Sequence, residues 1–493
     1  MSSAGQIECM NPATGERLAT LPSATDGEIA DKIAVIRRHL PDWQRLSLRD
    51  RSRFLTTVRK QLVTEMDSIV DTVCSETGKT DFDSLVEILV TCEIFRFVSR
   101  EGPRILRPER RSTGILKTKR AWVQYLPHGV VGVISPWNYP LILSAGPVVQ
   151  ALMAGNGVIL KPSEYATLTA LKLKDVFDRA GFPPSIFQVV VGNGSVGEKV
   201  VRERETRLIC FIGSVPVGRK IAVACAEQLK PAILELGGKD PLIVLEDANL
   251  DRAARAAVWG GFHNGGQTCI SVERVFVVES VADQFLERLM EIVGQVRVGP
   301  DRSHSDVGSL IHERQLQSVL AQVDDALRHG ARVPLGGDRL TNSGGVFLQP
   351  TVITEASETM EIMKEETFGP VIAVSTVKDA EEALEKANRG LYGLNASIFT
   401  ENGYRARQMT RNIEAGNVCI NDVLTNYLCV SLPFGGVKES GSGRLQGPEG
   451  ILNFVRTQSV CEDRWGLKKE PWWFPVSEGV KGAFRALVRI RHG

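Results

Sequence analysis

The sequence has no excess of charge of either sign and no uninterrupted apolar run long enough to cross a membrane. Its 493 residues carry 59 Lys and Arg against 58 Asp and Glu, a formal net charge of +1. A protein that binds nucleic acid needs a basic face, so we expect no nucleic acid partner. The stretch Val130–Leu160 lacks Asp, Glu, Lys and Arg, but prolines and glycines interrupt it. A membrane helix needs about 20 predominantly apolar residues, so we expect strands at 130–134 and 158–161 around a buried helix at about 141–154.

Ordered cysteine patterns and export signals are also missing. The chain has no C-x-x-C pair and no histidine at zinc-binding spacing, so we expect no metal site and reduced thiols in a cytosolic compartment. The N-terminal segment MSSAGQIECMNPATGE has no basic region followed by an apolar one, so no signal peptide is visible and a cytoplasmic protein is expected. Eight of the nine cysteines are expected to act as small buried hydrophobic residues: Cys9, Cys74, Cys92, Cys210, Cys225, Cys419, Cys429 and Cys461.

The order of apolar patterns predicts an α/β protein with more than one domain. A chain of this length supports two or three domains. Residues 26–40 and 48–100 show the apolar spacing of helices. Beyond them, short β-rich runs alternate with helical stretches, a pattern typical of right-handed β-α-β units and parallel sheets. Two such sheets are expected, with strands at 130–134, 157–161, 187–192, 207–213, 241–245, 272–278 and 395–399.

Four short motifs carry the chemistry. Cys269 lies in GGQTCIS, and Glu235 lies in LELGGK, 34 positions upstream. A lone thiol with a carboxylate set apart from it suits covalent catalysis, in which the thiolate adds to a carbonyl and the carboxylate later activates water. The other two motifs are PWNYP at 136–140 and EETFGP at 365–370. Together the four resemble the NAD(P)-dependent aldehyde dehydrogenase superfamily, and the resemblance runs from NPATGE at 11–16 to about Val460.

The resemblance implies an aldehyde-dehydrogenase-like α/β fold with two parallel-sheet domains and a small β oligomerisation arm. The arm of the resembled family pairs across subunits, so a homodimer or homotetramer is implied. The expected division is an NAD-binding domain at 1–108 and 128–237, a catalytic thiol domain at 238–430, the arm at 109–127 and 450–464, and a C-terminal extension at 465–493.

Two glycine-rich segments compete for the cofactor pyrophosphate. GNGSVG at 192–197 matches the dinucleotide fingerprint G-x-G-x-x-G after a predicted strand, but a lone match is weak. The resemblance points to FIGSVPVG at 211–218 instead. There Gly213 and Gly218 would allow close backbone approach, and Ser214 would donate to a phosphate at a helix N-terminus. We favour the later segment and expect the earlier glycines to form a turn near the adenine.

The resemblance also assigns the rest of the cofactor site. Lys161 and Glu164, in KPSE, would sit at the carboxyl end of a strand, although Lys and Glu elsewhere are usually solvated surface charges. Glu164 would accept both ribose hydroxyls of NAD and repel the extra phosphate of NADP, so NAD is favoured and NADP is the alternative. Glu366 would hold the nicotinamide ribose, Phe368 would pack beside that ring, and Trp137 would line the same channel.

The expected reaction turns a small-molecule aldehyde into a carboxylic acid. Cys269 is the nucleophile and needs a site that favours its thiolate. Asn138 and the backbone N–H of Cys269 would stabilise the oxyanion, and Glu235 would activate the water that hydrolyses the thioester. Relatives that transfer the acyl group to coenzyme A generally lack this carboxylate. The alternative functions are a coenzyme-A-acylating enzyme, an NADP-specific enzyme and a catalytically silent binding protein. The alternative role for Glu235 is a structural ion pair with Lys239.

Small and aliphatic side chains dominate the candidate substrate pocket. No Arg falls among its positions, which weighs against a carboxylate-bearing substrate such as a semialdehyde. We therefore expect a wide apolar pocket for medium- or long-chain, or aromatic, aldehydes. The positions follow the oxyanion Asn, follow the nucleophile or come from a late loop: Tyr139, Ile142, Leu143, Gly146, Ile270, Leu428 and Phe434.

The chain continues past the resemblance to Gly493 with a tryptophan-rich, basic segment. Trp465, Trp472 and Trp473 fall within nine residues, and the last fifteen residues contain no acid. Apolar residues at 480, 484, 487 and 488 recur at helical spacing, with basic residues at 481, 485 and 489 opposite. A basic amphipathic helix behind a Trp cluster fits peripheral membrane contact through 472–493. The alternative is packing on the enzyme itself or on a neighbouring subunit.

Overall fold

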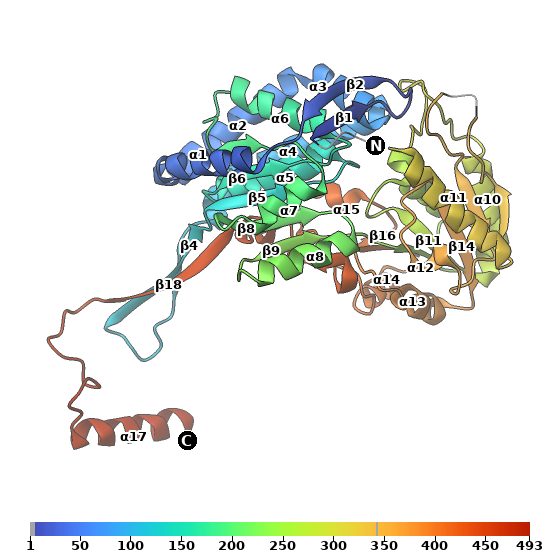
Figure 1. The fold of residues 1–493 in the computed structure, drawn as a ribbon. Coiled ribbons are helices and arrows are strands. Elements are labelled where there is room, and N and C mark those ends of the chain that lie inside the picture. The colour runs from blue at the N-terminus through green and yellow to red at the C-terminus, as the bar shows by residue number, and fades with distance from the viewer. Residues whose placement is uncertain (1–4, 342–343) are drawn as a thin grey trace. The chain divides into compact units, whose positions relative to one another are not determined.

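The protein divides into two compact units. A computed structural model describes residues 5–341 and 344–493, and Figure 1 shows its ribbon. One unit comprises Met1–Leu106 with Leu126–Arg456, and the other comprises Arg107–Tyr125 with Thr457–Gly493. Within the described residues, no helix is both long enough and apolar enough to cross a membrane.

The first unit contains a six-stranded sheet that forms its amino-terminal half. Five strands run parallel, and only the short β17 is antiparallel. All residues of β5 and β6 are buried, because a parallel sheet covered on both faces needs continuously apolar strands. Ile33 and Ile36 of helix α1 pack against this sheet. The strand order is β17 (Gly441–Ser442), β9 (Ala232–Glu235), β8 (Thr206–Ile212), β5 (Val130–Ile134), β6 (Gly157–Lys161) and β7 (Phe187–Val189).

A seven-stranded sheet forms the other half of this unit, and only its edge strand β12 is antiparallel. Successive residues of β10 enter opposite cores: Leu242 packs in one cluster and Ile243 in the other. The alternation follows from the two-residue period of a strand. The order is β12 (Arg332–Leu335), β13 (Thr351–Thr354), β14 (Val371–Val377), β11 (Val272–Val278), β10 (Asp240–Val244), β15 (Asn395–Phe399) and β16 (Asn417–Ile420).

Helices and a small hairpin complete the first unit. The hairpin is β1 (Gln6–Met10) with β2 (Arg17–Pro22). The helices that accompany the first sheet are α1 (Asp26–Arg45), α2 (Leu48–Thr64), α3 (Met66–Thr77), α4 (Asp81–Ile105), α5 (Pro140–Met153), α6 (Thr167–Arg179), α7 (Gly194–Arg202) and α8 (Val215–Ala226). The later ones are α9 (Leu250–Phe262), η1 (His263–Gly266), η2 (Glu279–Val281), α10 (Ala282–Val293), α11 (Glu313–Arg328), α12 (Glu361–Lys364), α13 (Ala380–Asn388), α14 (Gly403–Met409), α15 (Thr425–Leu428), η3 (Lys438–Ser440) and α16 (Gly447–Leu452).

The predicted α/β class with two mainly parallel sheets is confirmed, and individual boundaries differ from the sequence patterns. The strand predicted at 187–192 ends at Val189. The helical region predicted at 48–100 contains three helices, because the chain turns at Glu65 and again at Gly78. Gly78 has φ +70°, a left-handed conformation that ends a helix at little cost only for glycine.

The second unit consists of a three-stranded sheet and a terminal helix. The strand order is β18 (Val455–Asp463), β4 (Lys119–Pro127) and β3 (Glu109–Arg111), and the helix is α17 (Glu478–His492). Lys119 forms ion pairs with Asp463 and Glu470, which join the two chain segments of the unit. All residues of α17 are exposed or only partly buried.

Candidate active site

The site lies where the carboxyl ends of four adjacent parallel strands meet. Asn138 follows β5, Lys161 ends β6, Ser214 follows β8 and Glu235 ends β9. Open α/β sheets bind ligands at this edge because the loops after their strands converge there. Cys269 comes from the second sheet, in the loop before β11, so both halves of the first unit contribute to the site.

Two adjoining cavities connect these residues. The smaller, about 300 Å³, is lined by Asn138, Glu235 and Cys269 together with Trp137, Leu143, Glu366 and Phe368. The larger, about 840 Å³, is lined by Lys161, Glu164, Gly213 and Ser214. The residues common to both are Pro136, Trp137, Tyr165, Ile212, Gly213 and Ser214. A ligand in the larger cavity can therefore reach the thiol through the smaller one.

Glycines in two of the motifs permit the close approach of three loops. A Cβ on Gly238 would lie 2.3 Å from the backbone oxygen of Cys269, and one on Gly237 would lie 2.6 Å from the Glu366 carboxylate. A Cβ on Gly266 would lie 2.1 Å from the backbone oxygen of Gly369. Because no side chain fits at these positions, the glycines of LELGGK and GGQTC bring Glu366 beside the loop that carries Cys269.

Asn138 is held by residues that the motifs did not reveal. Its side-chain N–H donates to the Gln267 carbonyl at 3.0 Å, two residues before Cys269. The amide has a second N–H, which has no partner among the described residues. Lys79 Nζ donates to the Asn138 carbonyl at 2.6 Å, and Asn264 Nδ2 donates to it at 2.9 Å. The backbone of Asn138 is therefore fixed while one side-chain donor stays free in the cavity.

Lys79 itself belongs to a fully buried ion pair with Glu87. The Glu87 carboxylate also accepts hydrogen bonds from the backbone N–H groups of Leu141 and Ile142, at 3.0 and 3.3 Å, in the first turn of α5. Leu141 and Ile142 are two of the four N–H groups that a helix start leaves without intrahelical partners. The ion pair therefore connects α4, the PWNYP loop and α5 next to Asn138, the candidate donor to the oxyanion.

The carboxylates around the thiol form a coupled group. Burial and the neighbouring Glu366 raise the pKa of Glu235 to about 8. Burial, followed by the charge of Glu273, raises the pKa of Glu366 to about 8. Burial and the charges of Glu235 and Glu366 raise the pKa of Cys269 well above its usual value. These neighbouring charges are negative, so within the described chain they oppose the thiolate, and the expectation that the site favours it stays a prediction.

Glu235 is not paired with Lys239, the structural alternative raised by its motif. Lys239 instead forms a buried ion pair with Glu273 and donates to the Thr367 hydroxyl at 2.8 Å. Glu235 is 2% exposed, and its Oε1 has no hydrogen-bond partner among the described residues. A buried carboxylate oxygen without a partner costs stability, so this arrangement favours a chemical role over a structural one.

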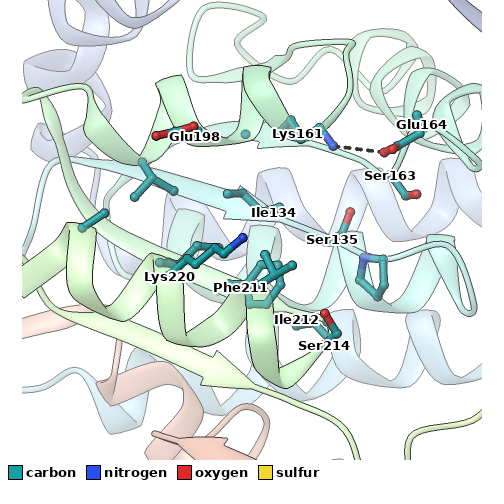
Figure 2. A pocket seen from close by; sticks show the side chains of 18 of the residues that line it. Ile134, Ser135, Lys161, Ser163, Glu164, Glu198, Phe211, Ile212, Ser214 and Lys220 are labelled. Atoms are coloured by element: carbon teal, nitrogen blue, oxygen red, sulfur yellow. Dashed lines mark ion pairs between the residues drawn. The ribbon is translucent and has the colours of Figure 1, made fainter. Parts of the chain in front are cut away.

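The remaining cofactor candidates line the two cavities. Lys161 Nζ lies 3.6 Å from a Glu164 carboxylate oxygen, and Figure 2 shows this pair at one edge of the larger cavity. Trp137 and Phe368 are in edge-to-face contact, with ring centroids 5.4 Å apart. Gly218 lies on α8, where a Cβ would meet the Leu236 side chain at 2.5 Å, so it fits the helix closely against the Glu235 loop.

Both glycine-rich segments lie at the larger cavity. Gly194 and Gly197 of the earlier segment line it together with Gly213 and Ser214 of the later one. Ser214 is the N-cap of α8, and its side chain makes no capping hydrogen bond within the described chain. The hydroxyl and the first N–H groups of α8 are therefore available to a phosphate. These donors and the size of the cleft fit a dinucleotide.

The substrate-pocket candidates are divided by the structure. Leu143 lines the smaller cavity, and Tyr139 hydrogen-bonds the Thr268 hydroxyl at 2.7 Å beside it. Among the described residues, six candidates line neither cavity: Tyr139, Ile142, Gly146, Ile270, Leu428 and Phe434. Ile270 and Phe434 pack in the core of the second sheet, whereas Leu428 is exposed. One arginine, Arg314, does line the smaller cavity; sequence reasoning placed none there.

Residues 5–341 and 344–493 contain no group of three or more His, Cys, Asp or Glu arranged to hold a metal ion.

Three residues that shape the site were missed in the sequence: Lys79, Glu87 and Glu273. Glu87 and Glu273 are charges inside otherwise apolar stretches, and Lys79 lies in a polar segment. Neither pattern shows whether the charge is buried. Glu273 accepts hydrogen bonds from the backbone N–H groups of Thr367 and Phe368, so it fixes the EETFGP loop.

Comparison with known proteins defines the class. The sequence model described as the aldehyde dehydrogenase family matches residues 1–460, so the chain belongs to this family. The chain is similar to 4,4'-diapolycopene aldehyde oxidase of Methylomonas sp, at 37% identity over 490 residues, covering 99% of this chain and 91% of that protein. It is also 37% identical over 456 residues to a putative succinate-semialdehyde dehydrogenase [NADP(+)] of Mycolicibacterium smegmatis, covering 92% of this chain and 87% of that protein.

The fold agrees with this assignment. A crystal structure of NAD-dependent aldehyde dehydrogenase from Sinorhizobium meliloti superposes with a TM-score of 0.91, at 33% sequence identity, covering 96% of this chain and 94% of that one. The protein therefore has the aldehyde dehydrogenase fold and belongs to a family of NAD(P)-dependent oxidoreductases that act on aldehydes.

Proposed function

We propose that this protein oxidises an apolar aldehyde, medium- or long-chain aliphatic or aromatic, to the carboxylic acid with NAD. The observation that carries the proposal is the convergence of Cys269, Asn138 and Glu235 on one cavity that adjoins a dinucleotide-sized cleft. The three residues supply the nucleophile, oxyanion donor and base that such a reaction needs.

The reaction begins at the thiol. After Cys269 loses its proton to solvent, the thiolate adds to the aldehyde carbon. The oxygen becomes an oxyanion, and the free N–H of Asn138 donates to it. When bound, the oxidised nicotinamide supplies the hydride acceptor and a positive charge near the thiol. Glu366, Trp137 and Phe368 would orient it there.

The second half of the reaction is hydrolysis of the thioester on Cys269. Glu235 removes a proton from water, the resulting hydroxide adds to the thioester carbon, and the Cys269 thiolate leaves as the carboxylic acid forms. The presence of this carboxylate supports hydrolysis over transfer to coenzyme A. The intact set of catalytic residues also speaks against a catalytically silent protein.

Cofactor choice rests on Glu164. Its carboxylate lines the larger cavity beside Lys161, where it would accept ribose hydroxyls and repel a 2'-phosphate. NADP is the alternative, supported by the NADP(+) in the names of the mycobacterial relatives. The ratio of kcat/KM with NAD to that with NADP decides between them, and a ratio below one would reject NAD.

The substrate class rests on two observations. Leu143 contributes an apolar wall to the cavity at the thiol, and a relative matched over 99% of this chain is named 4,4'-diapolycopene aldehyde oxidase. Arg314 and the relatives named for succinate semialdehyde favour a second candidate, a carboxylate-bearing aldehyde. Arg314 is exposed and adjoins Gln315, which donates to the Phe368 carbonyl at 3.0 Å, so we place it on the cofactor side of the cavity.

Steady-state NADH formation across aldehydes of rising chain length tests this proposal, with Cys269→Ala as the inactive control. We expect kcat/KM for decanal to exceed that for succinic semialdehyde by about tenfold or more, as a few buried methylenes allow. A preference for succinic semialdehyde that Arg314→Ala abolishes would establish the second candidate instead.

We also propose that the protein is a cytoplasmic homodimer or homotetramer, with an NAD-binding domain at 1–108 and 128–237, a catalytic domain at 238–430 and an oligomerisation arm at 109–127 and 450–464. The free edges of the three-stranded sheet support a pairing role for the arm, because an exposed edge strand presents unpaired backbone groups. Light scattering of the purified chain gives the assembly size, and a monomer would contradict the proposed arm.

A further inference from the structure

The last thirty residues, 464–493, form a tail that is fixed at its start and exposed beyond it. Near its start, the backbone N–H of Arg464 donates to the Thr118 carbonyl at 2.9 Å, and the buried Glu470 pairs with Lys119. Lys469 Nζ donates to the Pro475 carbonyl at 2.8 Å, which holds the following turn. The helix α17 after this turn has no buried residue.

The helix is two-sided. At 3.6 residues per turn, one arc carries the apolar residues Val480, Phe484, Leu487, Val488 and Ile490. The adjacent arc carries the basic residues Lys481, Arg485 and Arg489, and Arg491 falls within the apolar arc in the last turn. A helix of this kind suits an interface whose two sides are apolar and charged.

Aromatic residues before the helix extend the apolar surface. Trp473 is 52% exposed and Phe474 is 92% exposed, and Trp465 and Trp472 are also exposed. Large apolar side chains that stand singly on a surface need no explanation, but a group of them within one short segment marks an interaction site. Tryptophan favours the boundary between water and lipid because its ring is apolar and its N–H is polar.

The two units carry net charges of opposite sign. The unit formed by 107–125 and 457–493 contains thirteen Lys and Arg against five Asp and Glu, a net charge of +8. The whole chain has +1, so the other unit has −7. The basic charge is thus concentrated on the unit whose tail also exposes the apolar side chains.

We propose that the tail docks on the surface of an anionic lipid bilayer, with the apolar arc and the Trp473–Phe474 pair in the headgroup region and the basic arc on lipid phosphates. The fifteen residues of α17 are too few to span a bilayer, which needs about 20 apolar ones. An anionic lipid surface complements the net charge of +8 on the unit that carries the tail. The inference is independent of the proposed reaction, because it uses no residue of the active site.

Flotation of the full chain with vesicles of phosphatidylcholine, with and without 30 mol% phosphatidylglycerol, provides the test. The Arg485→Gln/Arg489→Gln variant is expected to bind anionic vesicles about 25-fold more weakly, at about fivefold per charge, and to bind neutral vesicles unchanged. The Phe484→Ser/Val488→Ser variant should lose at least about tenfold on both. The matched control, Arg38→Gln/Leu391→Ser, changes an exposed Arg and an exposed Leu outside the tail and should bind as the unmodified chain.

Circular dichroism and light scattering establish that each variant is folded. Binding of the full chain to anionic vesicles that is no stronger than to neutral ones overturns the proposal. So does equal binding by both tail variants and the control. Tail variants that change the assembly size or the thermal stability without changing vesicle binding would show that the tail packs on its own chain or on a second copy.

Discussion

Replacing Glu235 with Gln is expected to stabilise the protein and to arrest its turnover at the same time. The carboxyl is 2% exposed, its Oε1 has no partner among the described residues, and burial with the nearby Glu366 raises its pKa to about 8. Such a group opposes folding at neutral pH, because it must bind a proton or remain charged without solvent. The proposed role of Glu235 in catalysis would explain why the chain tolerates this cost.

The size of the stabilisation depends on pH. Below the ordinary pKa of 4.5 the carboxyl is protonated in both the folded and unfolded chain, so it does not affect the free energy of unfolding. As pH rises from 4.5 to about 8, the unfolded chain loses a proton that the folded chain keeps, and stability falls. At pH 7 the loss is about 3 kcal/mol, from about 2.5 pH units at 1.36 kcal/mol each. The neutral Gln removes this loss.

The catalytic effect has the opposite sign. A general base contributes about 10²–10⁴ in rate, so steady-state turnover of Glu235→Gln should fall by that factor. In the unmodified enzyme only about a tenth of Glu235 is ionised at pH 7, as a pKa of about 8 requires. Turnover should therefore rise almost tenfold from pH 6 to pH 7 and level off above pH 8.

Thermal unfolding at pH 5 and pH 8, with NADH formation in the same buffers, measures both effects. We expect unfolding temperatures of the two proteins to be close at pH 5 and to separate at pH 8, with the variant higher. A variant that is less stable at pH 8, or that keeps turnover within tenfold of the unmodified enzyme, would refute the reasoning. Glu366→Gln is the companion variant and should shift the pH profile towards acid, because it removes a charge that raises the Glu235 pKa.

Three further substitutions separate positioning from chemistry. Lys79→Met removes the ion-pair partner of Glu87, so the free energy of unfolding should fall by about 3–5 kcal/mol, and kcat should fall because Asn138 loses a hydrogen bond that holds it. The double variant Lys79→Met/Glu87→Gln should recover part of the lost stability in thermal unfolding. No recovery would contradict the pairing of Lys79 with Glu87. Asn138→Ala should lower kcat by about 10²–10³ in steady-state assays with little change in thermal stability, and an unchanged kcat would remove it from the oxyanion site. Glu164→Gln should lower the ratio of kcat/KM with NAD to kcat/KM with NADP by about tenfold, the effect of one charge contact near 1.4 kcal/mol. If this ratio is the same in the variant and in the unmodified protein, Glu164 does not select the cofactor.

The sequence predicted most about residues at the ends of parallel strands. Asn138, Lys161, Ser214 and Glu235 each follow or end an apolar run whose strand character is local, so topology alone brings them to one edge. Their motifs supplied the chemistry. The position of Cys269 against that edge depends on the second sheet, which local patterns do not place, and only the family resemblance predicted it.

Long-range buried contacts could not be predicted. Lys79 lies 59 positions from Asn138, and nothing in its neighbourhood distinguishes a buried ion pair from a solvated charge. The direction of the pKa shift at Cys269 could not be predicted either, because it depends on carboxylates at 235 and 366 whose spatial proximity is set by Gly237 and Gly238. Pocket positions were assigned by adjacency along the chain, which does not tell whether a side chain such as Phe434 faces the cavity or the core.

The most direct test of the central claim is the mass of the protein after reaction. Glu235→Gln is mixed with NAD and decanal, digested and mapped by mass spectrometry. We expect one decanoyl group per chain, located on Cys269, and a burst of about one NADH per subunit without further turnover. A protein that forms no acyl adduct, or carries it on another of the nine cysteines, would contradict the assignment of Cys269 and Glu235 as nucleophile and base.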